Sequence, residues 1–247
     1  MRNSTMSWRL SKTPCAGWAP EVKILVLAAH GDDELLGPGG TLIRHARSGD
    51  AVHAAICVGK PNLAMYPKTR YGTGVLAKRK RQAEQVGRTL GFKSVRNLNL
   101  KDECLEQDLN STVIAIEKVV REIAPHTVYL HHGGDLNQDH RGVFKAAMIA
   151  LRGYLKPAVA RVLCFETVSS TEQAPQVPGW LFAPNYFVDI TATLDQKIQA
   201  LQIYDDELVA FPHPRSAEGL RALAQTRGSA VGLRAAEAFQ LIRETVA

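Results

Sequence analysis

Short apolar runs alternate with longer segments of helical periodicity from Val22 onward. The first run, residues 23–29, ends at His30 and predicts a strand that is buried on both faces. Further strands are predicted at 51–58, 95–100, 127–131 and 159–166, with helices between them at about 41–48, 75–90, 111–123 and 139–155. This β-α-β-α rhythm predicts an α/β fold with a doubly wound, mostly parallel sheet and helices on both faces.

The chain is less regular after about Glu166, where five prolines interrupt it. Helices near 194–204, 216–225 and 233–246 are expected to pack on the outside of the sheet. No linker separates this part from the rest, so residues 22–247 are predicted to form a single domain. Residues 1–21 are predicted to be an N-terminal extension.

Residues with metal-binding and acid-base chemistry follow the predicted strands. His30 ends the first strand, Asp102 follows the third and His131 ends the fourth. In open α/β sheets, ligands bind at the carboxyl ends of the strands. We therefore expect these three side chains to gather along one edge of the molecule.

The segment His30-Gly31-Asp32-Asp33-Glu34 places a histidine and three acids directly after a buried strand. Burying several charges is costly unless a positive group compensates them, and a metal ion would do so. His30 and Asp33 can offer a nitrogen and an oxygen to one ion, which leaves Asp32 free for proton transfer. The structural alternative to a metal site is that Asp32, Asp33 and Glu34 are only a cluster of acids at the N-terminus of a helix, where negative charge is favourable.

A second cluster, residues 131–141, begins at another strand end and runs into a helix. His140 can supply a third ligand. Two histidines and one carboxylate form a known catalytic zinc set, in which water takes the fourth position and a neighbouring carboxylate can act as general base. His131 and His132 stay ambiguous between a role in the core and contact with substrate.

These motifs resemble those of the LmbE-like (PIG-L) family of zinc-dependent N-acetylglucosamine deacetylases. His30-Gly31-Asp32-Asp33-Glu34 is similar to the first motif of that family, and Asp139-His140-Arg141 to the second. Arg81-Gln82-Ala83-Glu84 matches its Arg-x-x-Glu helix. The later segments Pro212-His213-Pro214-Arg215-Ser216 and Ala236-Glu237-Ala238-Phe239 are also familiar from the family.

The resemblance implies a Rossmann-like fold and a zinc ion held by His30, Asp33 and His140, with another divalent metal left open. It implies that Asp32 is the general base, that Asp139 orients a neighbouring group or His140, and that Arg81 and Asp102 lie near the substrate. The implied reaction removes an N-acetyl or N-acyl group from an amino sugar or glycoside. The implied partner is a small-molecule or glycoconjugate substrate, and the family leans toward homo-oligomers.

The sequence departs from the family pattern at two positions. Gly31 stands where the family usually has proline, which leaves the ligand positions unaffected. Asn137 stands where many members carry a histidine that stabilises the oxyanion or acts as an acid. Asn137 can donate a hydrogen bond but cannot protonate an amine. His213 is our leading candidate to donate the proton that the leaving amine needs. The structural alternative is that His213 is only a loop histidine fixed between two prolines.

Composition excludes few partners. The net charge of +6 would favour anions, but no nucleic-acid recognition motif is present. No apolar run is long enough to span a bilayer. Residues 1–20 lack the continuous apolar stretch of a signal peptide. The four cysteines are scattered along the chain, which fits a cytoplasmic setting. The alternative function is that of a metal-free Rossmann-type nucleotide-binding protein. The turn after the first strand argues against it, because this turn is acidic and lacks G-x-G-x-x-G.

The loop 59–74, with Tyr66, Arg70 and Tyr71, would bind a sugar, close over the site or contact another subunit.

Overall fold

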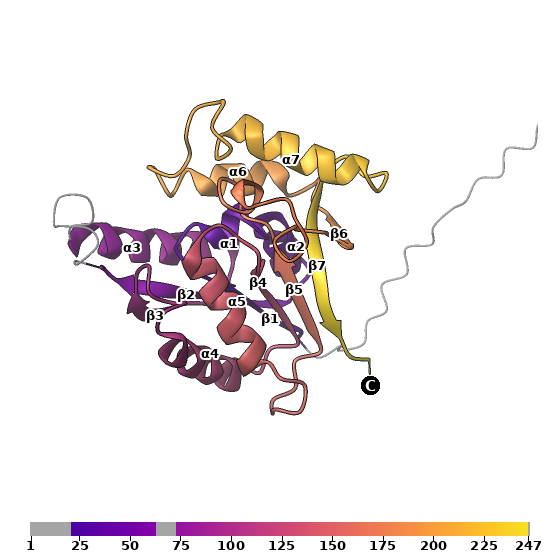
Figure 1. Cartoon of the computed structure of the whole chain (residues 1–247). Coiled ribbons are helices and arrows are strands. Elements are labelled where there is room, and N and C mark those ends of the chain that lie inside the picture. The colour runs from indigo at the N-terminus through magenta and orange to yellow at the C-terminus, as the bar shows by residue number, and fades with distance from the viewer. Residues whose placement is uncertain (1–20, 63–72, 247) are drawn as a thin grey trace, which may run out of the picture.

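A seven-stranded sheet forms the centre of the molecule in the computed structural model, which describes residues 21–62 and 73–246 (Figure 1). The strand order is β3-β2-β1-β4-β5-β7-β6. The first five strands pair in parallel, while β7 runs antiparallel to both β5 and β6. The strands are β1 (Lys23–Ala28), β2 (Ala51–Lys60), β3 (Ser94–Lys101), β4 (Thr127–His131), β5 (Arg161–Phe165), β6 (Tyr186–Asp189) and β7 (Ala236–Glu244). The predicted mostly parallel, doubly wound sheet is confirmed.

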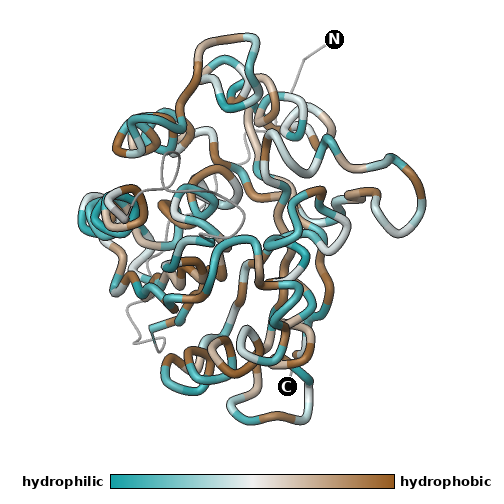
Figure 2. Tube along the Cα trace, turned by 60° about the vertical axis from the view of Figure 1, so that its left-hand side comes forward, coloured by the Kyte–Doolittle hydropathy of each residue, from teal (hydrophilic) through white to brown (hydrophobic). Residues whose placement is uncertain are grey.

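Helices cover both faces of this sheet (Figure 1). Helices α4 and α5 pack on one face through residues such as Ile116 and Val143. On the other face, α1, α3, α6 and α7 share a core that contains Leu35, Val86 and Ile198. Along the helices, apolar and polar stretches alternate, as one buried side requires (Figure 2). The helices are α1 (Asp33–Leu36), α2 (Gly39–Arg47), α3 (Thr73–Leu90), α4 (Leu109–Ile123), α5 (Gln138–Ala150), α6 (Leu194–Leu201) and α7 (Ala217–Ser229), with a 3-10 turn at Thr171–Gln173.

The C-terminal segment is a strand, so the predicted helix over 233–246 is wrong. Strand β7 lies between β5 and β6, and Phe239 is paired with Phe165 on one side and Tyr186 on the other. Residues such as alanine, glutamate and leucine favour a helix locally, but pairing on both sides overrides that preference. Strand β6 and helix α1 were not predicted, because each has only four residues.

Strand β7 also stabilises the start of α2, the helix that follows α1. The residue before α2 is Pro38, which provides no side-chain cap. Instead, the Glu237 carboxylate accepts hydrogen bonds from the backbone nitrogens of Gly40 and Thr41, each at 2.7 Å. The buried Lys197 ammonium donates to Glu237 at 2.7 Å and to the carbonyls of Leu36 and Gly37. This buried ion pair fixes the chain that leaves the first strand.

No helix within residues 21–62 and 73–246 combines the length and the apolar composition needed to cross a bilayer. Cys57 and Cys164 are buried free thiols. Residues 1–20 of the predicted extension (1–21) lie outside the described residues, as does most of the predicted loop at 59–74, including Tyr66, Arg70 and Tyr71.

Candidate metal centre and active site

The ends of three parallel strands bring the predicted residues together. His30 follows β1, Asp102 follows β3 and His131 ends β4. The His30 Nε2 atom lies 3.4 Å from Asp102 Oδ1, and the His131 Nε2 atom lies 3.4 Å from Asp33 Oδ2. Strands β1 and β4 are neighbours where the strand order reverses, which is where open α/β sheets form ligand sites.

The turn after β1 is held in an unusual conformation. Asp32 has a φ of 141°, which L-residues rarely adopt, so the surrounding contacts must enforce it. Its backbone nitrogen donates to Glu34 at 3.0 Å, and the buried Tyr204 hydroxyl donates to the same carboxylate at 2.5 Å. The backbone nitrogen of His30 donates to Asp33 at 2.8 Å. The two carboxylates have different neighbours, since Asp32 lies beside Arg215 and Asp33 beside His140.

Three side chains have the separations of metal ligands. One donor atom from each of His30, Asp33 and His140 lies within 4.8 Å of the others. Asp33 Oδ2 is 3.3 Å from His30 Nδ1 and 3.4 Å from His140 Nε2. Ligand atoms about 2.0–2.1 Å from a tetrahedral ion lie roughly 3.4 Å from one another. The donor set and its spacing therefore fit a zinc ion.

A carboxylate stands behind each of the two histidines. Asp139 Oδ2 lies 3.4 Å from His30 Nε2, and the Asp139 carboxylate accepts from the backbone nitrogens of Glu103 and Leu105. Asp135 Oδ1 lies 3.1 Å from His140 Nδ1 and accepts from Ser170. Such carboxylates fix the ring orientation of metal-binding histidines. Asp139 thus supports His30, while Asp135, which sequence reasoning did not single out, supports His140.

The other two histidines of the second cluster are occupied elsewhere. The fully buried His131 ring stacks on His140, with ring centres 3.8 Å apart, and its Nε2 accepts from the Ala29 backbone nitrogen. Burial and the neighbouring His140 lower the pKa of His131 to about 4, so this ring is neutral. The His132 ring nitrogens lie 2.9 Å from the carbonyl of Trp180 and 3.1 Å from Gln240. Neither ring has a nitrogen left for a metal.

Charge within the centre is arranged to attract a cation. Burial alone would lower the pKa of His140, but Asp33 and Asp135 raise it to about 9. Burial opposes ionisation of Asp33, yet the charge on His140 holds the pKa of this carboxyl well below its ordinary value. A buried carboxylate therefore faces two imidazoles, and a metal ion can take the place of the proton on His140.

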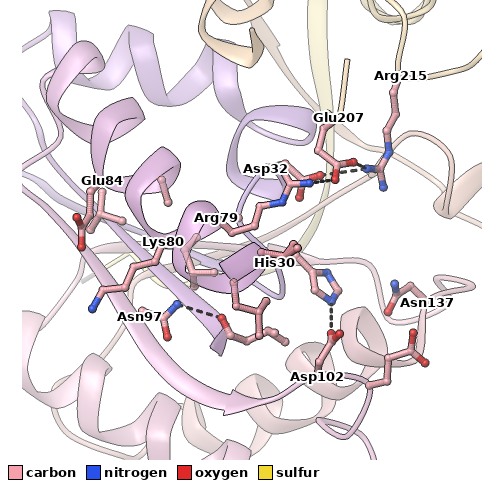
Figure 3. Close-up of a pocket in the computed structure, with 18 residues that line it drawn as sticks. His30, Asp32, Arg79, Lys80, Glu84, Asn97, Asp102, Asn137, Glu207 and Arg215 are labelled. Carbon is pink, nitrogen blue, oxygen red and sulfur yellow. Dashed lines mark hydrogen bonds and ion pairs between the residues drawn. The ribbon is translucent and has the colours of Figure 1, made fainter. Parts of the chain in front are cut away.

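Asp32 lies beside this centre and faces a different set of charges. Arg215 Nη1 donates to Asp32 Oδ2 at 3.1 Å, and Arg215 also pairs with Glu207 (Figure 3). Burial and the nearby Asp33 raise the pKa of Asp32 well above its ordinary value, against the pull of Arg215. A carboxylate with a raised pKa is suited to accept and return a proton near neutral pH.

The centre opens into a cavity of about 250 Å³ (Figure 3). Polar residues from separate segments line it beside the metal centre, and β2, β3 and α3 form the rest of the wall with apolar residues and with Lys80, Glu84 and Asn97. The polar lining includes His30, Asp32, Arg79, Asp102, Glu103, Asn137, Glu207 and Arg215.

Two predicted site residues do not reach this cavity. The side chain of Arg81 is exposed, because the cavity face of α3 carries Arg79, Lys80, Ala83 and Glu84 instead. His213 is exposed in its loop, and its Nδ1 accepts from the backbone nitrogen of Arg215. Arg79 and Arg215 point inward from the same two segments. Both segments therefore reach the cavity, but through Arg79 and Arg215 rather than through Arg81 and His213.

Asn137 lines the cavity, and its oxygen has a local role. The side-chain oxygen of Asn137 caps α5 by accepting from the backbone nitrogens of Asp139 and His140. This leaves the amide nitrogen as the group that can donate to a ligand. Asp102 also lines the cavity and is 6% exposed.

Comparison with known proteins gives relatives of two activities. The chain is 29% identical over 173 residues to the "uncharacterized deacetylase YaiS" of Escherichia coli (strain K12), which covers 68% of this chain and 81% of that protein. It is 28% identical over 193 residues to a 4-oxalmesaconate hydratase of Pseudomonas putida, with 74% of this chain and 73% of the relative covered.

A solved structure shares the fold. It is that of N,N'-diacetylchitobiose deacetylase from Pyrococcus horikoshii, with a TM-score of 0.71 and 22% identity over 89% of this chain and 83% of the other. A family model described as PIG-L, GlcNAc-PI de-N-acetylase, matches residues 25–151, about half of the 247 residues, from β1 to the end of α5. The chain therefore belongs to the PIG-L, or LmbE-like, family of de-N-acetylases.

Proposed function

We propose that this protein is a zinc-dependent hydrolase that removes an N-acetyl or N-acyl group from an amino sugar or related glycoside. The observation that carries the proposal is the approach of His30, Asp33 and His140 to within ligand distance of one another, with Asp32 beside them at the cavity. Membership of a de-N-acetylase family supports the reaction class. The setting we propose is cytoplasmic, since the buried cysteines are free thiols.

His30, Asp33 and His140 are the residues that would hold the ion. When bound, zinc would polarise the amide carbonyl and lower the pKa of water at the open position. Asp139 and Asp135 keep the two histidine rings in place from behind. The protein's part is thus a fixed set of ligands that needs little rearrangement on binding.

Asp32 is the proposed general base. It takes a proton from the attacking water, and it returns that proton to the amine nitrogen as the amide C–N bond breaks, which balances the reaction. Arg215 holds the Asp32 carboxylate toward the cavity at 3.1 Å. This route needs no separate acid, and it replaces His213, whose side chain lies outside the cavity.

Asn137 is the proposed oxyanion donor. Its oxygen is held by the backbone of α5, which leaves the amide nitrogen of this cavity-lining residue as the donor for a ligand. A preorganised donor of this kind stabilises negative charge that develops on the carbonyl oxygen. Asp102 and Glu103, at the polar edge of the cavity, are suited to accept bonds from sugar hydroxyls.

Release of acetate from a panel of N-acetylated amino sugars tests the proposal. We expect turnover that a chelator abolishes, and a loss of at least a hundredfold in Asp32→Asn with the metal retained. Asp195→Asn is the matched control, because that carboxylate is exposed on α6 and remote from the cavity. Full activity in Asp32→Asn would contradict the base role, and no turnover of any N-acyl compound by the metal-loaded protein would contradict the reaction class.

Hydration of an unsaturated substrate with several carboxylates is a second candidate, because a 4-oxalmesaconate hydratase is among the relatives. A substrate with several carboxylates needs unpaired cations around it. Arg79 is paired with Asp206 and Glu207, and Arg215 with Asp32 and Glu207. Lys80 is the cavity-lining cation for which the described residues provide no ion pair. The charge balance therefore favours a substrate without several acidic groups.

Nucleotide binding by a metal-free Rossmann domain is not favoured. A dinucleotide site needs backbone donors and little negative charge after the first strand. Here that turn buries Asp32, Asp33 and Glu34.

A further inference from the structure

The cavity extends beyond the metal centre along an apolar wall. His30, Asp102 and Asn137 lie on one side of it, and Lys80, Glu84 and Asn97 lie on the other (Figure 3). The wall is made by Ile56 and Val58 of β2, Val95 of β3, and Val75, Leu76 and Ala83 of α3. We call these six residues the apolar arm.

Helix α3 lines the arm with one regular face. Its cavity residues occur in pairs four positions apart, at 75 and 76, 79 and 80, and 83 and 84. This spacing keeps them on one side of the helix, one turn after another. Ala83 is 3% exposed and is the smallest residue on that face. Its missing side-chain bulk leaves space between the helix and the strands.

The polar residue among the strands does not make the arm hydrophilic. The Asn97 amide nitrogen donates to the Val58 carbonyl at 3.0 Å, and its oxygen accepts from the Asn99 backbone nitrogen at 2.8 Å. Asn97 therefore spends its hydrogen bonds inside the protein. The six residues of the apolar arm present carbon atoms to a ligand, while the charged side chains of Lys80 and Glu84 stand on the same side of the cavity.

The volume is larger than an acetyl group requires. An apolar cavity of about 150 Å³ accepts benzene, with its six carbons. A cavity of about 250 Å³ therefore holds on the order of ten non-hydrogen atoms. An acetyl group adds only a carbonyl and a methyl, so an acetylated substrate whose sugar lies against the polar lining would leave the apolar arm unfilled.

The chemistry of the arm selects an acyl chain over a sugar ring. A sugar carries hydroxyls around its ring, and burying each without a partner is costly. Methylene groups have no such demand and gain free energy on burial. The sugar is better placed against the polar residues Asp102, Glu103 and Asn137; Asp102 and Asn137 lie on the side of the cavity away from Lys80 and Glu84 (Figure 3).

We infer that the apolar arm is an acyl-chain subsite and that the preferred substrates are N-acyl amino sugars with acyl chains longer than acetyl. The inference rests on the proposed function, because it takes the metal centre as the place where the amide is cleaved. It adds that selectivity for chain length comes from Ala83 and its neighbours.

The test compares N-acylglucosamines with chains of two, four, six and eight carbons. Each added methylene is expected to raise kcat/KM about threefold to fourfold until the arm is full. The same compounds are titrated calorimetrically into the metal-free protein, so that binding is measured without turnover. The hexanoyl compound is expected to bind more tightly than the acetyl compound, by tenfold or more.

Two variants narrow the arm. Ala83→Leu fills its centre, and Val75→Phe fills it from a partly buried position that tolerates more bulk. Each should lower the ratio of hexanoyl to acetyl kcat/KM at least tenfold, with the same trend in binding. Ala77→Leu is the matched control, because Ala77 is exposed on α3 and does not line the cavity. Thermal unfolding shows whether each variant is folded. If Ala83→Leu is not folded, the result for Val75→Phe decides the test.

The outcomes separate the two claims. Hydrolysis of the acetyl compound with no gain from longer chains overturns the acyl subsite and leaves the proposed function standing. Absence of hydrolysis for every chain length, combined with tighter hexanoyl binding that Val75→Phe removes, overturns the proposed function and supports the subsite. Equal binding of all four compounds overturns the subsite whatever the activity.

Discussion

Replacing Lys197 by methionine tests how strongly the ion pair between α6 and β7 stabilises the fold. Lys197 and Glu237 are only 5% and 7% exposed. The ammonium donates three hydrogen bonds, to Glu237 at 2.7 Å, to the Gly37 carbonyl at 2.9 Å and to the Leu36 carbonyl at 3.1 Å. Methionine has a similar length but donates none of them, so a buried carboxylate and two carbonyls lose their partner.

Removing one member of a buried pair costs about 3–5 kcal/mol, because the other charge stays buried without compensation. For a domain of this size, each kcal/mol lowers the melting temperature by roughly 2–4 °C. We therefore expect Lys197→Met to melt roughly 10 °C below the wild type. The double variant Lys197→Met/Glu237→Gln should lose less stability than the two single variants lose together, because it leaves no unpaired buried charge.

Urea unfolding and thermal melts provide the measurement. Lys145→Met is the matched control, since Lys145 is 52% exposed in its pair with Glu106 and its loss should cost less than about 1 kcal/mol. If the free energy of unfolding of Lys197→Met were within about 1 kcal/mol of the wild-type value, the argument that this buried pair stabilises the segment after α1 would be refuted.

Two further predictions concern the carboxylates around α5. Asp135→Ala should weaken zinc binding about tenfold to a hundredfold, measured by competition with a chelating dye, because His140 loses the group that orients it; affinity equal to that of Asp195→Ala would count against this role. For Glu106, burial alone would raise the pKa, but Lys145 and Arg141 lower it. The interactions of Glu106 with Lys145 and Arg141 therefore stabilise the fold fully at pH values above 4.5, the ordinary pKa of the carboxyl. Their contribution is lost as the pH falls through the lowered pKa of Glu106. The stability difference between wild type and Glu106→Gln should shrink between neutral and acidic pH, and a difference that grows on acidification would contradict the sign.

The parts of the site that depend on strand ends could be predicted from the sequence. The motifs around His30 and His140 each follow an apolar run, and the carboxyl ends of parallel strands meet at one edge. Asp135 was missed because its role depends on how the loop before α5 folds back on His140. That loop is fixed by Ser170 and Thr171, which lie far away in the sequence.

Choices within a segment could not be predicted, because they depend on packing. Arg79 rather than Arg81 reaches the cavity, since the rotation of α3 is set by its contacts with β2 and β3. Arg215 rather than His213 faces Asp32, because the His213 ring caps its own turn. Strand β7 has local helix propensity that pairing with β5 and β6 overrides.

Metal content is the most direct test of the central claim that His30, Asp33 and His140 hold one divalent ion. Mass-spectrometric analysis of protein dialysed after zinc loading should find about one zinc per chain in the wild type and in His126→Ala, whose exposed ring lies outside the site. His30→Ala, Asp33→Ala and His140→Ala should each retain only a small fraction of that zinc while still folded. Undiminished zinc in all three variants, or none in the wild type, would contradict the account.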